Sequence, residues 1–593
     1  MTSQENISFR DTFLLLGRYL RPEWPRVILL TILLFTGIGL QLLAPQFLRD
    51  FLDLATGEIE QTRLGGFTSL TRTALFFMIV AISNQLFTAA AAYITQDVRW
   101  RTTNELRADL AQHTMSLDMG FHNARTAGEM ISRVDEDVNM LSNFFSQFII
   151  QIFGNGLLII GVLFVLFRED YRIGAGFLFF VVITGLVLNY VIKLAVPYWK
   201  EFFAMGARLF AFIEERLAGT EDIRANGGVA YTMLGLYQTL RRQYEVEQKA
   251  FALGMLTWST TQGFFRLGTA LGLGLGGWLF TRDIITIGTV YLVVNYSALM
   301  QEPLRLLTQQ LQDLQRAVAG ASRIRDMMFT ETAVKDNTSS VIQPRSGPLS
   351  VEFSNVDFEY VADTPVLQDV SFDLKPGEVM GLLGRTGSGK TTTTRLIFRL
   401  YEPQNGRIRL GNRHIAAFSL QELRRKVGMV TQEVQLFNAT IRDNLTFFDP
   451  SISDDQILSA MRDLELMDWF TSLADGLETV IETGGRGLSA GEAQLLAFTR
   501  VFLDDPGLII LDEASSRLDP ATEFLIERAV DKLLQNRTAI IVAHRLKTVQ
   551  RADQIMILEN GRVKEHDHRE VLIANPDSHF SQLLKTGLEE VLV

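Results

Sequence analysis

The sequence predicts an all-α membrane domain of six helices with long cytoplasmic helical extensions, followed by an α/β domain. Three observations lead to this fold class. Six long apolar stretches lie within the first 301 residues, the composition changes after residue 325, and short apolar runs alternate with helical patterns from residue 351 onward. A helix that crosses a bilayer needs about 20 apolar residues. One such stretch could be a buried core helix, but six together predict membrane spans.

The composition excludes several classes of protein. The chain has 593 residues, of which 47% are hydrophobic and 21% charged, and it contains no cysteine. This excludes a disordered chain and a fibrous repeat. The lack of cysteine excludes disulfides, thiolate metal sites and a cysteine nucleophile. The net charge of −11 argues against a large nucleic-acid surface, so no nucleic-acid partner is expected.

The helical half starts with residues 1–26, in which an amphipathic elbow helix is expected on the membrane surface. No signal peptide is expected, because this charged lead precedes the first apolar run. The membrane domain is predicted to cover 27–330. Its six spans are expected at 27–48, 73–96, 138–167, 173–192, 250–281 and 284–301.

The loops between the spans predict their orientation. Residues 1–26 and the two long loops, 97–137 and 193–249, carry seventeen lysines and arginines, whereas the other three loops carry six. By the positive-inside rule, both termini and the two long loops are cytoplasmic and the lipid bilayer is a partner of the chain. Because the long loops keep a helical pattern, spans two to five are expected to project into the cytoplasm as long helices.

The fifth stretch carries one charge, Arg266, near its middle. A charge in the bilayer core costs at least about 2.5 kcal/mol, so Arg266 is expected to face the bundle interior or a cavity. There it could meet an anionic group of a substrate, or it could pair with Glu302 or another polar side chain, and the sequence leaves these alternatives open. Gly268, Gly272 and Gly276 recur on one face and predict the close approach of a neighbouring helix. Other polar residues of the spans are expected mainly to form helix–helix hydrogen bonds: Asn84, Gln85, Asn155, Asn189 and Asn295.

A polar segment separates the two halves. Residues 331–349 are rich in serine, proline and charged residues, which predicts a linker. Residues 350–593 follow as one α/β domain. Within it, the apolar runs 379–383 and 508–511 predict buried parallel strands.

A phosphate-binding loop follows the first of these strands. The loop has the pattern G-x-x-x-x-G-K-[ST] between a strand and a helix, which is the context that this motif requires. Its backbone N–H groups and the helix N-terminus attract phosphate. Lys390 supplies a charge for the β- and γ-phosphates of ATP, and the Thr391 hydroxyl can bind Mg²⁺. The predicted nucleotide-binding residues here are Gly384, Arg385, Thr386, Gly387, Ser388, Gly389, Lys390, Thr391 and Thr392.

Two carboxylates end the second buried strand. Asp512 is placed to hold Mg²⁺, and Glu513 to polarise an attacking water as the general base. The alternative is a strand that ends in a solvated acidic turn. The phosphate loop upstream favours the catalytic interpretation.

Further motifs accompany the phosphate loop in a fixed order: FSNVDFEY before it, then VGMVTQEVQLF, LSAGE, SSRLD and IIVAHRL. With these motifs the chain resembles ATP-binding cassette (ABC) transporters of the exporter type, in which a six-helix membrane domain is fused to one nucleotide-binding cassette. The resemblance implies that Tyr360 stacks on adenine, that Gln432 contacts Mg²⁺, that Asp519 lies in a loop exchanged between paired cassettes, and that His544 is the switch histidine at the γ-phosphate. It also implies a signature motif that acts on a partner's ATP: Leu488, Ser489, Ala490, Gly491 and Glu492.

The membrane half resembles the same family. Residues 121–138 are similar to the first cytoplasmic loop, with a coupling helix near 121–126, and residues 214–228 to the second, with a coupling helix near 227–234. Residues 287–304 are similar to the sixth helix.

The signature departs from the family pattern. That pattern is usually Leu-Ser-Gly-Gly-Gln with a basic residue after it, whereas here Ala490 and Glu492 replace a glycine and the glutamine. Gly485 stands where a glutamate is customary. An acidic Glu492 near a γ-phosphate should weaken the signature by Coulomb repulsion.

This asymmetry resembles heterodimeric exporters, in which one chain keeps its hydrolytic residues and has a variant signature. The expected partner is a second ABC half-transporter with a conventional signature, which would close the one competent site of this chain. A homodimer that tolerates both replacements is the alternative.

The resemblance implies an ATPase with ATP and Mg²⁺ as cofactors. The plasma membrane of a prokaryote is the expected location, because no organellar targeting segment appears. It would export a hydrophobic or amphipathic substrate, such as a drug, lipid or peptide. Two alternatives are an importer built on the exporter fold and a non-transporting regulatory ATPase.

Overall fold

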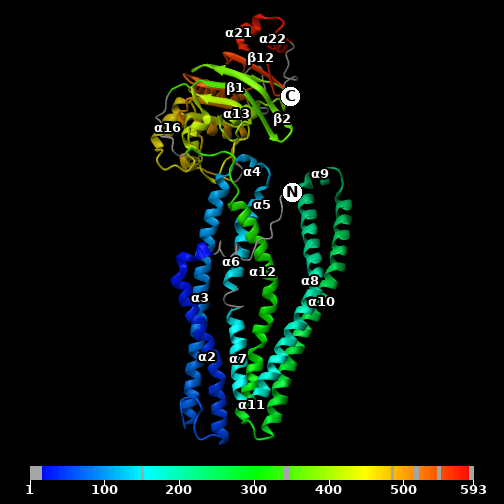
Figure 1. Ribbon diagram of the computed structural model, residues 1–593. Helices are drawn as coiled ribbons and strands as arrows, with labels where there is room; N and C mark the ends of the chain where they lie inside the picture. The colour runs from blue at the N-terminus through cyan, green and yellow to red at the C-terminus, as the bar shows by residue number, and fades with distance from the viewer. Residues whose placement is uncertain are drawn as a thin grey trace. The chain divides into compact units, whose positions relative to one another are not determined.

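The computed structural model describes residues 17–147, 153–337, 347–473, 475–482, 487–512, 520–543 and 549–585 (Figure 1). The chain divides into two compact units. The first consists of Met1–Met115 and Ala127–Phe329, and the second of Ser116–Thr126 and Thr330–Val593. A short piece of the first cytoplasmic loop therefore belongs to the unit that contains the α/β domain.

The first unit is all-helical. The predicted spans fall mainly in helix over their described residues, as expected from stretches that must satisfy their backbone groups internally, although residues 284–286 of the sixth precede α11. The elements are η1 (Arg21–Glu23), α2 (Trp24–Thr56), α3 (Leu70–Ser116), α5 (Ala127–Ser132), the π-helical turn η2 (Arg133–Asp137), α6 (Val138–Gln147), α7 (Asn155–Glu169), α8 (Tyr171–Ala218), α9 (Thr220–Ala225), α10 (Val229–Phe280), α11 (Ile287–Leu299) and α12 (Gln301–Met328).

Three helices in the described part of the chain are long and apolar enough to cross a membrane: Gly17–Thr56, Leu70–Ser116 and Tyr171–Ala218. Two of them, α3 and α8, run well beyond the predicted spans, and so does α10. This agrees with the predicted helical extensions. The third predicted span includes residues 148–152, which lie outside the described residues, and the sixth ends where α11 gives way to α12 at Met300.

The glycine stripe of α10, which consists of Gly268, Gly272 and Gly276, packs closely against neighbouring helices, as predicted. A Cβ added at Gly268 would lie 2.8 Å from Phe180 of α8, and one at Gly276 would lie 3.2 Å from Val290 of α11. Only hydrogen at these positions lets both helices approach α10 so closely.

A buried ionic cluster joins the ends of three helices in this unit. Arg49 of α2 is 2% exposed and forms an ion pair with Glu169 of α7. Asp53, which is fully buried, accepts hydrogen bonds from the backbone N–H of Gly288 (2.8 Å) and from the hydroxyl of Thr286 (2.7 Å) at the start of α11. These charges hold α2, α7 and α11 together at the end that the loop charges predict to face away from the cytoplasm.

The second unit contains α4 (Met119–Asn123) and the α/β domain. Its strands form a six-stranded sheet in the order β12-β11-β3-β10-β9-β6, a four-stranded sheet in the order β2-β1-β4-β5, and the pair β7-β8. The strands are β1 (Val351–Val361), β2 (Thr364–Leu374), β3 (Val379–Leu383), β4 (Asn405–Leu410), β5 (Arg413–His414), β6 (Val427–Val430), β7 (Ala439–Thr440), β8 (Val480–Ile481), β9 (Leu508–Asp512), β10 (Thr538–Val542), β11 (Gln554–Glu559) and β12 (Arg562–His568).

Helices surround these sheets. They are α13 (Lys390–Ile397), η4 (Ile415–Ala417), α14 (Leu420–Lys426), α15 (Ile441–Thr446), α16 (Asp454–Asp463), α17 (Met467–Thr471), η5 (Gly476–Glu478), α18 (Ala490–Asp504), α19 (Pro520–Leu534), α21 (Arg569–Ala574) and α22 (His579–Lys585). The strands β3 and β9 coincide with the two predicted buried strands, and all five residues of each are buried.

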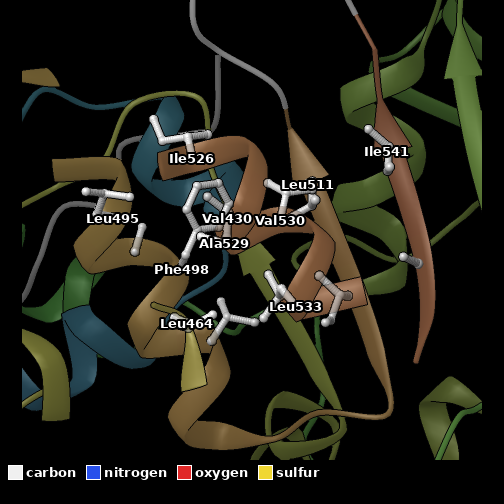
Figure 2. Packing of buried hydrophobic residues seen from close by; sticks show 14 of the residues in the cluster. Val430, Leu464, Leu495, Phe498, Leu511, Ile526, Ala529, Val530, Leu533 and Ile541 are labelled. Atoms are coloured by element: carbon white, nitrogen blue, oxygen red, sulfur yellow. The ribbon is translucent and has the colours of Figure 1, made fainter. Parts of the chain in front are cut away.

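A shared core fixes α18 and α19 against the six-stranded sheet (Figure 2). Phe498 of α18 and Ala529 of α19 belong to the same buried cluster as Leu511 of β9. Because protein cores are close-packed, α18 is held in a defined position relative to the strand that ends at Asp512. Other members of this cluster are Val430, Leu464, Leu495, Ile526, Val530, Leu533 and Ile541.

Candidate nucleotide site and signature helix

The phosphate loop has the backbone that its glycines permit. Gly384, Gly387 and Gly389 have φ angles of +145°, +82° and +106°. A Cβ at Gly384 would lie 2.3 Å from the carbonyl oxygen of Leu558, and one at Gly389 would lie 2.5 Å from Leu367. Glycine is therefore required at these two positions both by conformation and by space.

Lys390 lies inside this loop. Its Nζ donates hydrogen bonds to the carbonyl oxygens of Gly384 (2.5 Å) and Arg385 (3.2 Å). Burial lowers the pKa of Lys390, and the carboxylate of Asp512 acts in the opposite direction. Next to it, the buried hydroxyl of Ser388 has no hydrogen-bond partner in the described part of the chain. The loop thus presents an ammonium group and a hydroxyl donor where phosphate would bind.

The register of the parallel strands brings further predicted residues to one edge of the sheet. Val542 of β10 lies opposite both Asp512 of β9 and Leu382 of β3. Asp512 is 7% exposed. On the other side of β9, β6 ends at Val430, and Gln432 follows with an exposed side chain. The strands that carry the phosphate loop, Asp512 and Gln432 therefore end together at one edge of the sheet.

Tyr360, near the end of β1, lies beside the phosphate-loop helix. Its hydroxyl is 3.1 Å from that of Thr392 and accepts a hydrogen bond of 3.4 Å from Arg395. Phe358 and Tyr401 contact its ring edge-on, with centroids 4.8 and 5.0 Å away. Tyr360 is 41% exposed, so its ring can offer a face to a planar base.

The predicted signature forms the start of α18. Ser489 is the N-cap, and its hydroxyl accepts from the N–H of Glu492 at 3.2 Å. The carboxylate of Glu492 in turn accepts from the N–H of Ser489 at 2.6 Å, which completes a capping box. The side chains of Ser489 and Ala490 are exposed, whereas Gly491 is buried.

The second oxygen of the Glu492 carboxylate also has a partner within the cassette. The indole N–H of Trp469 donates to it at 3.0 Å. The carboxylate is therefore turned back onto its own helix N-terminus, where the helix dipole favours a negative charge. The repulsion of a phosphate by Glu492 stays a prediction. The observed geometry argues against it, because the carboxylate is turned back onto its own helix.

Comparisons with known proteins agree with this geometry. The family model described as "ABC transporter" matches residues 367–516, and that of the "ABC transporter transmembrane region" matches residues 27–304. The chain is similar to a fatty acid ABC transporter ATP-binding/permease protein of Mycobacterium bovis, with 30% identity over 516 residues that cover 87% of this chain and 81% of the relative. The chain belongs to the ABC transporter family.

Other relatives resemble this ABC transporter over most of its length. ATP-dependent lipid A-core flippase 1 of Colwellia psychrerythraea is 29% identical over 540 residues, 88% of each chain. The structure of a bacterial Atm1-family ABC exporter with ATP bound matches with a TM-score of 0.78 and 22% identity, and covers 95% of this chain and 99% of that chain. The predicted fold class, a helical membrane domain followed by an α/β P-loop ATP-binding cassette, is confirmed, and this ABC transporter is an ATPase by family.

The structural role of Arg500 of α18 was not predicted from the sequence. Its position in an otherwise apolar helix was the only signal that could have indicated it. The side chain is buried and donates to the backbone oxygens of Asn444 (2.5 Å) and Gln435 (3.1 Å). The side-chain amide of Asn444 in turn accepts a hydrogen bond from the N–H of Phe437 and donates one to its carbonyl oxygen. Burial lowers the pKa of Arg500 to about 10, so it stays charged at neutral pH. In this ABC transporter the loop after Gln432 is thus fastened to the signature helix.

The first predicted coupling helix is α4, which starts slightly earlier than expected. Its N-cap, Asp118, accepts from the N–H of Phe121 (3.1 Å) and from that of Ala333 (2.7 Å), in the segment that enters the cassette. Asn123 at the other end of α4 donates to the hydroxyl of Tyr401 at 2.6 Å. Tyr401 is a second residue that the sequence did not reveal.

The second coupling helix was placed incorrectly. The short helix at this bend of the transporter is α9, Thr220–Ala225, whereas residues 229–234 already belong to α10. The difference arises because Gly227 and Gly228, which follow α9, form the turn between the two helices.

The structure argues against one interpretation of Arg266, its pairing with Glu302. Its side chain is exposed on α10, and no ion pair of Arg266 occurs among the described residues. Glu302 instead pairs with Arg305, one turn away on α12, with a hydrogen bond of 2.9 Å. A substrate contact of Arg266 stays a prediction. Gly485, Glu513, Asp519 and His544 lie outside the described residues, so their predicted roles stay predictions too.

Proposed function

We propose that this chain is one subunit of an ATP-driven exporter that moves a hydrophobic or amphipathic substrate across the inner membrane of a prokaryote. The observation that carries the proposal is the buried Lys390 in its glycine loop, beside Asp512, in a chain with a transmembrane region. Relatives named as a lipid A-core flippase and a fatty acid transporter support a lipid-like substrate. We place both termini and the cassette in the cytoplasm, on the charge of the loops.

The residues at the sheet edge fit Mg²⁺ bound with ATP. The hydroxyl of Thr391, the amide oxygen of Gln432 and the carboxylate of Asp512 are oxygen donors, which Mg²⁺ prefers. The ion would supply charge neutralisation between the phosphates. Lys390 then binds the β- and γ-phosphates, and Tyr360 offers its exposed face to adenine. Glu513 would take a proton from the attacking water, and His544 would contact the γ-phosphate.

We also propose that the functional unit is a heterodimer, in which this chain supplies the catalytic Glu513. Ser489 and the N-terminus of α18 would face the partner's nucleotide, with the hydrogen of the Ser489 hydroxyl left to donate to phosphate. The support is the variant signature together with the retained Glu513 and His544. It no longer includes repulsion by Glu492, whose carboxylate is held by Ser489 and Trp469.

ATPase measurements on the purified chain test this proposal, first alone and then with a neighbouring half-transporter from the same genome. We expect negligible turnover alone, turnover with the partner, and its loss in Glu513→Gln. Glu570→Gln, an exposed glutamate of α21, is the matched control and should keep full activity. Robust turnover by this chain alone that depends on Glu513 would establish a homodimer and contradict the heterodimer.

Transport itself is tested in inside-out membrane vesicles that contain both subunits and a fluorescent lipid. ATP should drive accumulation of the lipid in the lumen, and Lys390→Met should abolish it. Depletion of the lumen by ATP would indicate import, and ATP hydrolysis without any net movement would indicate a regulatory ATPase.

A further inference from the structure

A cavity of ≈ 260 Å³ lies between α2, α3 and α7 of the membrane unit. Its walls come from residues 33–41 of α2, 88–92 of α3 and 154–158 at the start of α7. Residues 33–41 lie near the middle of the first predicted span and 88–92 lie within the second, so the cavity is within the predicted bilayer core. None of its lining residues belongs to the cassette.

The chemistry of the walls is amphipathic. Most of the lining is aliphatic, as at Leu33 and Leu158, but two carboxamides, Gln41 and Asn155, also face the space. Neither of these side chains forms a hydrogen bond with another residue in the described ranges. Thr88 also lines the cavity, but its hydroxyl is used within α3, where it donates to the carbonyl of Asn84 at 2.8 Å. In a bilayer core an amide without a partner costs several kcal/mol, so a ligand with an oxygen acceptor would relieve that cost.

We infer that this cavity binds one alkyl chain of an amphipathic molecule, with a carboxylate or ester oxygen of that molecule accepting from Gln41 or Asn155. The volume is below the about 300–1,000 Å³ of pockets for drug-sized ligands, which suits a single narrow chain better than a ring system. This inference rests on the proposed function, because it assigns a lipid-like substrate to a place in the transporter.

Two glycines leave the space open. A Cβ added at Gly37 or at Gly154 would meet no atom within 4 Å, and both residues line the cavity. Further along α7 the gap is closed, since a Cβ at Gly161 would lie 2.5 Å from Leu42. Gly39 also has free space around a Cβ, but it does not line the cavity. Gly37→Leu and Gly39→Leu are therefore a matched pair, in which only the first fills the cavity.

Photolabelling of the assembled transporter in lipid nanodiscs tests the inference, with a palmitic acid that carries a diazirine at mid-chain as the probe. We expect saturable labelling of peptides that contain residues 33–41, 88–92 or 154–158, and competition by unlabelled palmitate. Labelling should fall about tenfold in Gly37→Leu. This is the low end of the loss of affinity that one poorly fitting group causes in an apolar pocket. It should be unchanged in Gly39→Leu.

Four results would overturn the inference. Equal labelling of the two variants, or labelling that palmitate does not compete, would show contact with bulk lipid only. Absence of labelling in the assembled transporter would show that a helix of the partner fills the space. Reduced labelling of both variants would show a general effect of leucine on α2.

The failure of this inference is distinguished from that of the proposed function by comparing labelling with ATP-driven lipid movement. Gly39→Leu lies outside both the nucleotide site and the cavity, so its basal turnover with the partner should stay at the wild-type level. If labelling is not saturable while ATP still drives lipid movement, only the cavity assignment fails. If saturable labelling occurs but ATP drives no movement, the binding site stands and the exporter proposal fails.

Discussion

The side-chain amide of Asn123 donates a hydrogen bond of 2.6 Å to the hydroxyl of Tyr401, and the ring of Tyr401 contacts Tyr360 edge-on at 5.0 Å. Asn123 ends the short helix α4 of the first cytoplasmic loop, and Tyr360 is the aromatic residue proposed to stack on adenine. A single tyrosine therefore lies between the nucleotide site and a segment that follows the long helix α3 and precedes the short helix α5.

This relationship predicts that Tyr401→Phe weakens the coupling of ATP hydrolysis to transport. The variant keeps the ring beside Tyr360 but removes the hydroxyl that Asn123 needs, and one hydrogen bond contributes about 0.5–1.5 kcal/mol. We expect transport per ATP to fall about two- to tenfold with the KM for ATP unchanged. Asn123→Ala should reproduce the effect, whereas Tyr401→Leu should also raise the KM, because the ring is lost. Wild-type coupling in both Tyr401→Phe and Asn123→Ala would contradict the prediction.

Glu492→Gln distinguishes a structural role of this residue from a repulsive one. Glutamine also serves in a capping box, so we expect less than about 0.5 kcal/mol of lost stability and an ATPase rate within about twofold of wild type. Glu492→Ala removes the cap and the partner of Trp469, and should cost about 1–2 kcal/mol in denaturant unfolding. A tenfold rise of ATPase activity in Glu492→Gln would mean that the charge does repel the nucleotide.

Asp118 predicts how docking of the first cytoplasmic loop depends on pH. Partial burial raises the pKa of Asp118, but hydrogen bonds from the backbone N–H groups of Ala333, Phe121 and Gly120 outweigh this and hold the pKa below its usual value. A lowered pKa means that the ionised form stabilises docking above the usual pKa of about 3.9, and that this stabilisation is lost only as the pH falls through the folded value.

Docking at residues 116–126 should therefore be independent of pH between about pH 5 and 8. Asp118→Asn at neutral pH should mimic strong acid and speed hydrogen exchange in residues 116–126 and 330–337. Exchange in the six-stranded sheet is the internal control and should not change. Equal exchange of wild type and Asp118→Asn in both segments would contradict the assigned role.

The ionic cluster of the membrane unit predicts a large loss of stability in Arg49→Met. This change leaves the carboxylates of Asp50 and Glu169 without the guanidinium that pairs with both, and breaking a buried pair costs about 3–5 kcal/mol. Thermal unfolding in detergent should show a clear drop in the transition temperature. Arg63→Met, at a partly exposed position that also contacts Glu169, is the control and should have a much smaller effect. Equal stability of the two variants would contradict a structural role of the buried cluster.

The sequence alone determined the elements whose chemistry is local. The phosphate loop is defined by glycines and a lysine within one short segment, and its positive φ angles follow from those residues. The spans follow from apolar length, the glycine stripe from its spacing, and the ends of β3 and β9 from runs of branched apolar residues. Each of these features depends on residues close together in the chain, so a pattern in the sequence is enough to predict it.

Tertiary structure decided the partners of individual polar side chains. Asn123 and Tyr401 are 278 residues apart, and Arg500 and Asn444 are 56 apart, so no local pattern connects them. The same reason explains why the sequence left other contacts open. The sequence placed Glu492 toward a phosphate and offered Glu302 to Arg266, but Trp469 and Arg305 provide nearer partners once the chain has folded. A buried or half-buried charge pairs with whichever group packing brings within hydrogen-bond distance, and packing is a property of the whole fold.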